Sequence, residues 1–276
     1  MTSQTNKNLI LEVKNLKKYF PIEKGFFRRA VGQVRAVDDV SLFIKEGETL
    51  GLVGESGSGK TTLAQVLMGL PPYKIVQGTI IFKGKNITKF TPEKRSKLGL
   101  GLVFQNPPAI KGVTLNNLIE AINSRKKTLS SFFFEKTMTN LKTRDINVGF
   151  SGGEKKISEL YQLVCLNPQL VILDEIDSGL DIERLQQMIH FIKNKFYFKQ
   201  SEKKGSRAIA RGSYNRQRAF LIITHREDIL KYLNPSMTHI LLDGKIICSS
   251  KDWLAIWKTI KKYGYEKCEN CPKKVC

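Results

Sequence analysis

The sequence predicts an α/β protein, with a parallel sheet flanked by helices and an added antiparallel β subdomain. Short apolar runs typical of buried strands lie at 49–54, 98–105, 170–175 and 220–225, and segments with helical spacing alternate with them. Strands that alternate with helices imply a parallel sheet with right-handed crossovers. Other segments alternate apolar and polar residues, as the half-buried strands of an antiparallel sheet do.

Hairpins account for the antiparallel part of this prediction. Residues 9–16 and 34–44 alternate apolar and polar side chains, and the basic segment between them, FPIEKGFFRRAVGQ, is expected to be a hairpin or a loop. Residues 77–87 form a second expected hairpin. Residues 239–249 form a third, with an Asp-Gly dipeptide that favours a tight turn.

Helical spacing dominates two further segments, residues 114–143 and residues 181–196. Together these elements predict one globular domain, a basic insertion and a tail. The expected boundaries are 8–265 for the domain, with the antiparallel β subdomain and a glycine loop in 8–90, a short helical subdomain in 106–150 and further core in 151–250; 199–218 for the insertion; and 266–276 for the tail.

The chain carries a large positive charge. It has 46 Lys and Arg residues against 25 Asp and Glu residues, for a formal net charge of +21. Such an excess suits a polyanion, an anionic membrane surface or an acidic partner, and equally a protein that simply stays soluble. In segment 199–218, seven basic residues stand against Glu202 alone, so we expect a solvated loop there, with anion binding as the alternative.

The sequence shows neither a membrane span nor a secretory signal. No apolar stretch approaches the roughly 20 residues that a membrane-spanning helix needs. The first residues, MTSQTNKNL, lack the apolar region of a signal peptide. We therefore expect a cytoplasmic protein, with any membrane association peripheral and at the inner face.

A glycine-rich loop follows the first buried strand and opens a helical segment. Its pattern, Gly54-x-x-x-x-Gly59-Lys60-Thr61, is a Walker A motif. The glycines let successive backbone N–H groups cradle phosphate oxygens, and the helix N-terminus adds its dipole. Lys60 can reach the β- and γ-phosphates, while the Thr61 hydroxyl can ligate Mg²⁺. The alternative is a glycine-rich turn with an incidental lysine. The residues expected to bind ATP here are Gly54, Glu55, Ser56, Gly57, Ser58, Gly59, Lys60, Thr61 and Thr62.

A second strand supplies the acidic half of such a site. The apolar run LVILDE ends in Asp174 and Glu175. Asp174 is expected to act on Mg²⁺ indirectly, through a group that binds the ion directly. Glu175 is expected to polarise an attacking water. Two carboxylates that serve only solubility are the alternative. The pair predicts hydrolysis of a phosphoanhydride by an in-line water.

The segment FSGGEKK, residues 150–156, resembles the signature motif of ATP-binding cassette ATPases, commonly written LSGGQ. Further elements fall in the family's order: Tyr19 (or Phe20) at the adenine-stacking position, Gln105 at the Q-loop, residues 178–181 at the D-loop and His225 at the switch histidine. The resemblance implies a P-loop NTPase core of RecA-like type, with an antiparallel β subdomain and a short helical subdomain.

The same resemblance implies roles for individual residues. It assigns catalysis to Lys60, Gln105, Glu175 and His225, with Gln105 also at Mg²⁺. In this family the signature residues contact the γ-phosphate held by another subunit, so two cassettes enclose two ATP molecules head to tail. A homodimer or ATP-induced dimer is therefore expected. The residues that would contact nucleotide in this way are Ser151, Gly152, Gly153, Glu154 and Asp181.

Two branches of the family contribute to the likeness. Residues 9–62 resemble the ATPase subunits of oligopeptide and dipeptide importers. From residue 63 onward the chain resembles the ATPase of the Suf iron–sulfur cluster assembly system, most clearly at 154–156 and at 174–183. Because the Suf-like part covers more of the chain, we expect a Suf-type ATPase with scaffold proteins as partners. The alternative is an importer subunit docked on membrane permeases.

The segment 106–150, Ile157 and the C-terminal tail depart from the pattern of both branches. The segment 106–150 is shorter than either branch leads us to expect, and Ile157 stands where both usually carry Arg. A nucleic-acid partner is disfavoured, because no base-stacking aromatic pattern accompanies the basic segment. The tail has a C-x-x-C pair and one more cysteine, which suggests a soft-metal site or else a plain tail. Its candidate ligands are Cys268, Cys271 and Cys276.

Overall fold

The computed structural model of this protein describes residues 8–24, 29–123, 140–197 and 218–269. Within these residues a six-stranded sheet has the order β12-β11-β3-β10-β9-β6. Its pairs are parallel except β11 with β12, which form the predicted C-terminal hairpin. The strands are β3 (Thr49–Val53), β6 (Leu100–Val103), β9 (Leu170–Asp174), β10 (Ala219–Thr224), β11 (Met237–Leu242) and β12 (Lys245–Ser250).

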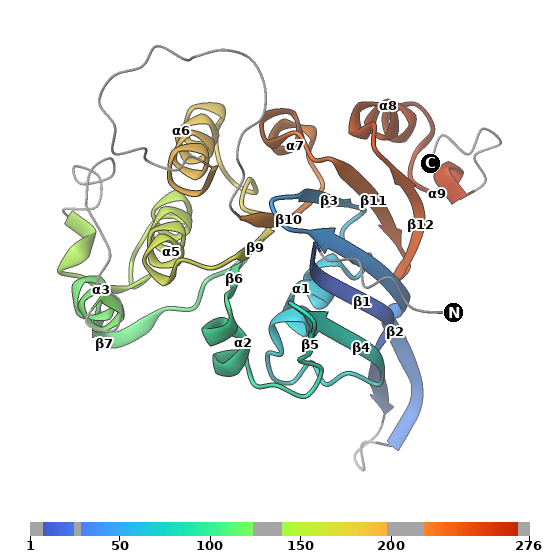
Figure 1. Cartoon of the computed structure of the whole chain (residues 1–276), viewed down its shortest axis with the longest axis horizontal. Coiled ribbons are helices and arrows are strands. Elements are labelled where there is room, and N and C mark those ends of the chain that lie inside the picture. Colours follow the sequence, from blue (N-terminus) through green and yellow to red (C-terminus); the bar gives the residue numbers. More distant parts are fainter. Residues whose placement is uncertain (1–7, 25–28, 124–139, 198–217, 270–276) are drawn as a thin grey trace.

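Helices cover the sheet, as Figure 1 shows. One face packs on α1, together with the second sheet, and the other face packs on α5 to α8. Every residue of β3, β9 and β10 is therefore buried, which explains why these strands are continuous apolar runs in the sequence. The helices are α1 (Lys60–Met68), α2 (Pro92–Leu98), α3 (Leu115–Asn123), α5 (Gly152–Leu166), α6 (Ile182–Ile192), α7 (Glu227–Leu233), α8 (Trp253–Tyr263) and α9 (Glu266–Glu269), with a π-helical turn η1 (Lys193–Tyr197) after α6.

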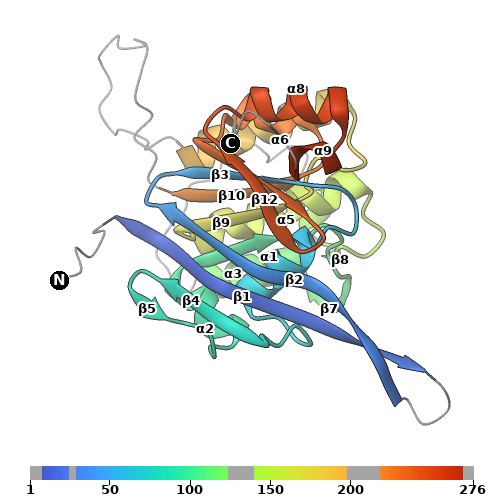
Figure 2. The ribbon, with the colours of Figure 1, turned by 90° about the vertical axis from the view of Figure 1, so that its right-hand side faces the viewer.

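The second sheet is antiparallel and contains the first two predicted hairpins. Its strands are β1 (Leu9–Lys24), β2 (Arg29–Lys45), β4 (Gln77–Phe82) and β5 (Lys85–Asn86). β1 and β2 are longer than the alternation of side chains predicts, and Figure 2 shows their far end projecting beyond the body. Ile22 and Val31 in this far end are exposed, so neither face of the strands is buried there. The sequence therefore lacks the alternation of apolar and polar residues that would predict these strand ends.

The segment between β6 and α5 forms a smaller unit. β7 (Ile110–Thr114) pairs antiparallel with β8 (Asp145–Ile146), and α3 confirms part of the predicted helical stretch. Residues 124–139 of that stretch lie outside the described residues. The β7–β8 pair is not predicted, because it joins residues far apart in the chain and β7 is largely exposed. Ile157 packs on the apolar cluster of this unit.

The basic insertion requires one correction. Residues 199–217 lie outside the described residues, but Arg218 is not the solvated loop residue that the sequence suggests. Its guanidinium donates to the backbone carbonyls of Lys195, at 2.9 Å, and Phe196, at 3.3 Å, and also to the side-chain oxygen of Asn167. Carbonyls at the end of a helix lack hydrogen-bond partners within the helix, and the Arg218 guanidinium is the donor for these two carbonyls.

The C-terminal tail is described as far as Glu269, where α9 ends. Cys268 is 4% exposed and packs in the apolar cluster beneath α8. Cys271 and Cys276 lie outside the described residues, so the metal site remains a prediction. Among the helices of the described part of the chain, none has the length and apolar character that a membrane span requires.

A partly buried histidine in β11, His239, predicts that the stability of the fold depends on pH. His239 Nδ1 lies 2.6 Å from the Ser249 hydroxyl, and burial lowers the pKa of His239 to about 4 from 6.5. Between these two values the unfolded chain binds a proton that the folded chain does not, so the free energy of unfolding falls as pH falls. Urea unfolding at about pH 7.5 and about pH 5 should show a larger loss for the wild type than for His239→Asn. Equal losses would contradict this assignment.

Candidate functional site

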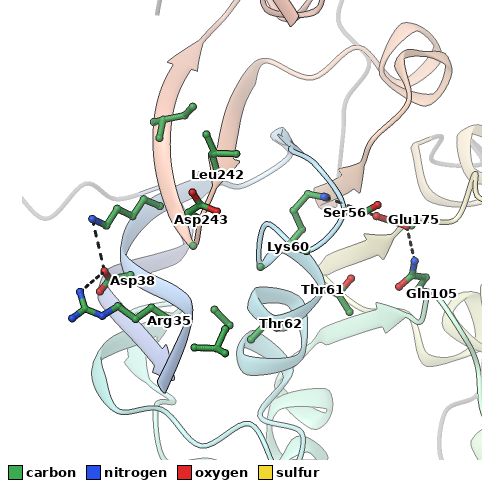
Figure 3. A pocket seen from close by; sticks show the side chains of 17 residues that line it. Arg35, Asp38, Ser56, Lys60, Thr61, Thr62, Gln105, Glu175, Leu242 and Asp243 are labelled. Atoms are coloured by element: carbon green, nitrogen blue, oxygen red, sulfur yellow. Dashed lines mark hydrogen bonds and ion pairs between the residues drawn. The ribbon is translucent and has the colours of Figure 1, made fainter. Parts of the chain in front are cut away.

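The glycine-rich loop joins β3 to α1, and the side chain of Lys60 folds back over it (Figure 3). Lys60 is the first residue of α1, and its Nζ donates to the carbonyl oxygens of Gly54, at 2.8 Å, and Glu55, at 2.7 Å. The Lys60 residue is 3% exposed, and this burial lowers the pKa of its ammonium. The charge is thus held at the mouth of the loop, at the start of the helix.

Two glycines of the loop allow close contact with neighbouring strands. A Cβ atom at Gly54 would lie 2.2 Å from the carbonyl oxygen of Leu241, and one at Gly59 would lie 1.9 Å from that of Ala36. Gly59 also has φ of 101°, which residues with a side chain rarely adopt. Any larger residue would push the loop away from β2 and β11, and the lysine would move with it.

Asp174 and His225 enter the site from two neighbouring parallel strands. β9 and β10 end at the same edge of the sheet, so Asp174 and His225 reach the loop from adjacent positions. The Thr61 hydroxyl donates to Asp174 Oδ1 at 3.2 Å. Burial raises the pKa of Asp174 to about 6. Two of the three residues assigned to Mg²⁺ from the sequence, Thr61 and Asp174, are therefore in contact.

Glu175 lies at the centre of the predicted catalytic residues. Gln105 Nε2 donates to Glu175 Oε2 at 2.6 Å, His225 Nδ1 lies 3.4 Å from Glu175 Oε1, and Lys60 Nζ lies 4.0 Å from the same oxygen. Glu175 has φ of 46°, a sparsely populated conformation for a residue with a side chain. Strained backbone of this kind is often found at functional sites. The fold thus brings Lys60, Gln105, Glu175 and His225 together.

A cavity of about 640 Å³ extends from Glu175 across the loop to the β11–β12 turn (Figure 3). Its far end combines apolar side chains with charged ones, namely Val34, Leu242, Ile247, Arg35, Asp38 and Lys245. Tyr19 adjoins this end, because its hydroxyl donates to Asp38 Oδ1 at 2.6 Å. Phe20 packs instead against the ring of Tyr73, with centroids 5.7 Å apart. Of the two aromatic candidates, Tyr19 is the one beside the cavity.

The signature residues lie at a different place. Ser151 caps α5: its hydroxyl accepts from the backbone N–H of Glu154, and the Glu154 carboxylate accepts from the backbone N–H of Ser151 at 2.7 Å. Asp181 caps α6 with a single bond, in which its carboxylate accepts from the backbone N–H of Arg184 at 2.8 Å. Ser151, Gly152 and Asp181 are exposed and do not line the cavity formed by the described residues. The predicted nucleotide contacts therefore fall into two separate groups.

Sequence reasoning missed charged residues that hold the catalytic loops. Lys156 is buried, and its Nζ donates to the carbonyl oxygens of Glu175, at 2.9 Å, and Ser178, at 2.6 Å. Asp177 accepts from the hydroxyl of Thr224 at 2.7 Å, and Thr224 is the residue directly before His225. Both fix backbone that carries catalytic side chains. A signal existed at Lys156, because a charged residue there interrupts the apolar face of a helix.

A strand-to-helix phosphate loop with a buried lysine, beside a strand that ends in two carboxylates, defines a P-loop nucleotide hydrolase. The family described as ABC transporter matches residues 37–178, which is about half of the chain and includes the loop, Gln105 and both carboxylates. The chain belongs to this family and is an ATP hydrolase.

Named relatives extend the match over nearly the whole chain. The probable ATP-dependent transporter ycf16 of Antithamnion sp. is 33% identical over 95% of this chain and 98% of its own length. The probable ATP-dependent transporter SufC of Escherichia coli is 36% identical over 82% of this chain and 90% of its own. ABC transporter I family member 6, chloroplastic, of Arabidopsis thaliana is 34% identical over 93% and 72%.

Solved structures share the fold. A nucleotide-free ATP-binding cassette from an ABC transporter aligns with a TM-score of 0.66 at 24% identity, over 94% of this chain and 98% of that one. A dimeric bacterial ABC transporter cassette aligns with a TM-score of 0.63 at 18% identity, over 87% and 97%. These alignments confirm the predicted fold class, an α/β core with an antiparallel β subdomain.

Proposed function

We propose that this ATPase is the energy-converting component of a Suf-type iron–sulfur cluster assembly system and acts in the cytoplasm. The observation that carries the proposal is the identity of 36% with the Escherichia coli relative named SufC, over 82% of this chain. The Suf-like residues 154–156 and 174–183 agree with it. The two segments meet where Lys156 donates to the backbone carbonyl of Glu175. The importer alternative depends on residues 9–62, which form the smaller part of the chain.

We propose that each copy supplies one half of two composite catalytic sites. In the first half, Glu175 takes the proton of the attacking water, Gln105 and His225 orient it, and Lys60 holds the β- and γ-phosphates. The contacts of Glu175 with Gln105 and His225 support this assignment. Tyr19 is proposed to stack on the adenine at the far end of the cavity, after it leaves Asp38.

The residues present fit a magnesium ion. Mg²⁺ prefers oxygen ligands, and the Thr61 hydroxyl lies 3.2 Å from the Asp174 carboxylate, with the Gln105 side chain nearby at Glu175. We propose that Thr61, Gln105 and Asp174 form the Mg²⁺ site. When bound, Mg²⁺ neutralises charge that develops on the transferred phosphate.

The second half of each site is proposed to come from a partner copy. The exposed start of α5 presents N–H groups that favour an anion, while the cavity of the same chain does not include them. A head-to-tail dimer would bring Ser151, Gly152, Gly153 and Glu154 of one copy to the γ-phosphate held by the other. Asp181, exposed at the start of α6, would lie at the same interface.

Affinity purification of the tagged chain from its source cell, followed by identification of co-eluting proteins, tests the cellular role. Scaffold proteins of the Suf type are the expected partners, and they should elute from a Glu175→Gln variant as well. Membrane permease subunits would contradict the Suf assignment and favour the importer alternative. The ATPase assignment does not depend on this result.

A further inference from the structure

A buried carboxyl group outside the predicted site connects α5 to the Q-loop. Glu159 is 9% exposed, and its Oε2 accepts from the backbone N–H of Phe104 at 2.8 Å. Phe104 is the residue directly before Gln105. Gln105 in turn donates to the Glu175 carboxylate at 2.6 Å. A short chain of contacts therefore runs from α5, through the Phe104 backbone, to the carboxylate proposed as catalytic base.

This carboxyl group is costly to the fold. Burial raises the pKa of Glu159 to about 7, because a charged group loses solvation in the interior. An apolar side chain of similar size would avoid that cost, and replacement of buried charges by apolar residues is often neutral or stabilising. The group has a partner in a backbone N–H of a catalytic loop, so a role in positioning explains its presence better than packing does.

A second buried charge on the same helix makes a parallel contact. Lys156 precedes Glu159 by three residues, so both project from one side of α5. Lys156 donates to the backbone carbonyls of Glu175 and Ser178, whereas Glu159 accepts from the backbone of Phe104. α5 therefore touches the backbone of both loops that contribute side chains to the contact between Gln105 and Glu175.

We propose that Glu159 is a positioning residue that fixes the Q-loop backbone to the signature helix, so that Gln105 is held on Glu175. Loss of the Glu159 contact would then free Gln105 to move relative to the catalytic carboxylate, whose backbone Lys156 still holds. This inference rests on the proposed roles of Gln105, Glu175 and the start of α5. It concerns the rate of the chemical step, and nucleotide affinity should depend on Glu159 only weakly.

The test compares Glu159→Met, which fills the space without an acceptor, with Glu159→Gln, whose amide oxygen can accept the same hydrogen bond. Ser158→Ala removes a buried hydroxyl from the neighbouring position of α5 and serves as the matched control. We expect Glu159→Met to lower kcat about tenfold or more, with KM for ATP changed less than about threefold. Glu159→Gln should keep kcat within about threefold of the wild type, and Ser158→Ala should behave likewise.

Hydrogen exchange at the Phe104 amide gives a readout independent of turnover. It should be faster in Glu159→Met than in Glu159→Gln, because only the second retains an acceptor. Unchanged kcat in Glu159→Met, or a rise of KM that accounts for its whole effect, would overturn the proposal. If Glu159→Met does not fold, a Glu159→Gln variant with kcat as low as that of Glu175→Gln would overturn it. Full turnover by Glu175→Gln would instead refute the proposed role of Glu175 as the catalytic base, on which this inference rests.

Discussion

Lys60→Ala is expected to lower the affinity for ATP by about 30-fold or more, because truncating one partner of a buried charge pair costs roughly 2–5 kcal/mol. The Lys60 ammonium already lies over the loop, held by the carbonyls of Gly54 and Glu55. It therefore meets the phosphates without a large rearrangement. Titration with a fluorescent ATP analogue measures the loss.

Lys97→Ala provides the control for this experiment. Lys97 is an exposed lysine of α2 that does not line the cavity, so its removal changes the net charge by the same amount without touching the loop. Its affinity for ATP should match that of the wild type. Retention of tight ATP binding by Lys60→Ala would contradict the assignment of the phosphate loop.

Glu175→Gln is expected to reduce the rate of ATP hydrolysis by about 10²- to 10⁴-fold, the range that a positioned general base contributes. The amide has the size of the carboxylate but cannot accept the proton of the attacking water. Affinity for ATP should remain near that of the wild type, because Glu175 faces Gln105 and His225 and takes no part in the proposed phosphate contacts.

Single-turnover measurements with saturating Mg²⁺ and ATP separate the chemical step from binding. Glu93→Gln, the same change at an exposed residue of α2, should keep the wild-type rate. Hydrolysis by Glu175→Gln at the rate of Glu93→Gln would show that another group activates the water, and the proposed role of Glu175 would have to be abandoned.

The parallel core was predictable from the sequence because burial on both faces leaves a visible pattern. β3, β9 and β10 are buried along their whole length, so each is apolar apart from one polar residue at its end. The far ends of β1 and β2 and the β7–β8 pair lack that pattern, because they are exposed or pair over a long distance in the chain. Their backbone pairing is set by tertiary structure.

The site divides in a similar way. Lys60 and Glu175 belong to motifs whose chemistry is evident from residue type and spacing, whereas Gln105 and His225 were identified only by resemblance to a family. Lys156 and Glu159 escaped both approaches. Their partners are backbone atoms of loops that reach α5 only in the folded chain. A charge on the apolar face of the helix marks Lys156, but no local pattern identifies the backbone atoms that it contacts.

The central claim, that two copies enclose nucleotide between them, is tested most directly by the mass of Glu175→Gln in solution. Light scattering with saturating ATP and Mg²⁺ should give twice the mass of the 31.4 kDa chain, and without nucleotide the mass of one chain. Adding Ser151→Arg, which places a bulky side chain at the exposed start of α5, should leave a monomer that still binds ATP. A Glu175→Gln protein that stays monomeric at saturating ATP and Mg²⁺ would contradict the account.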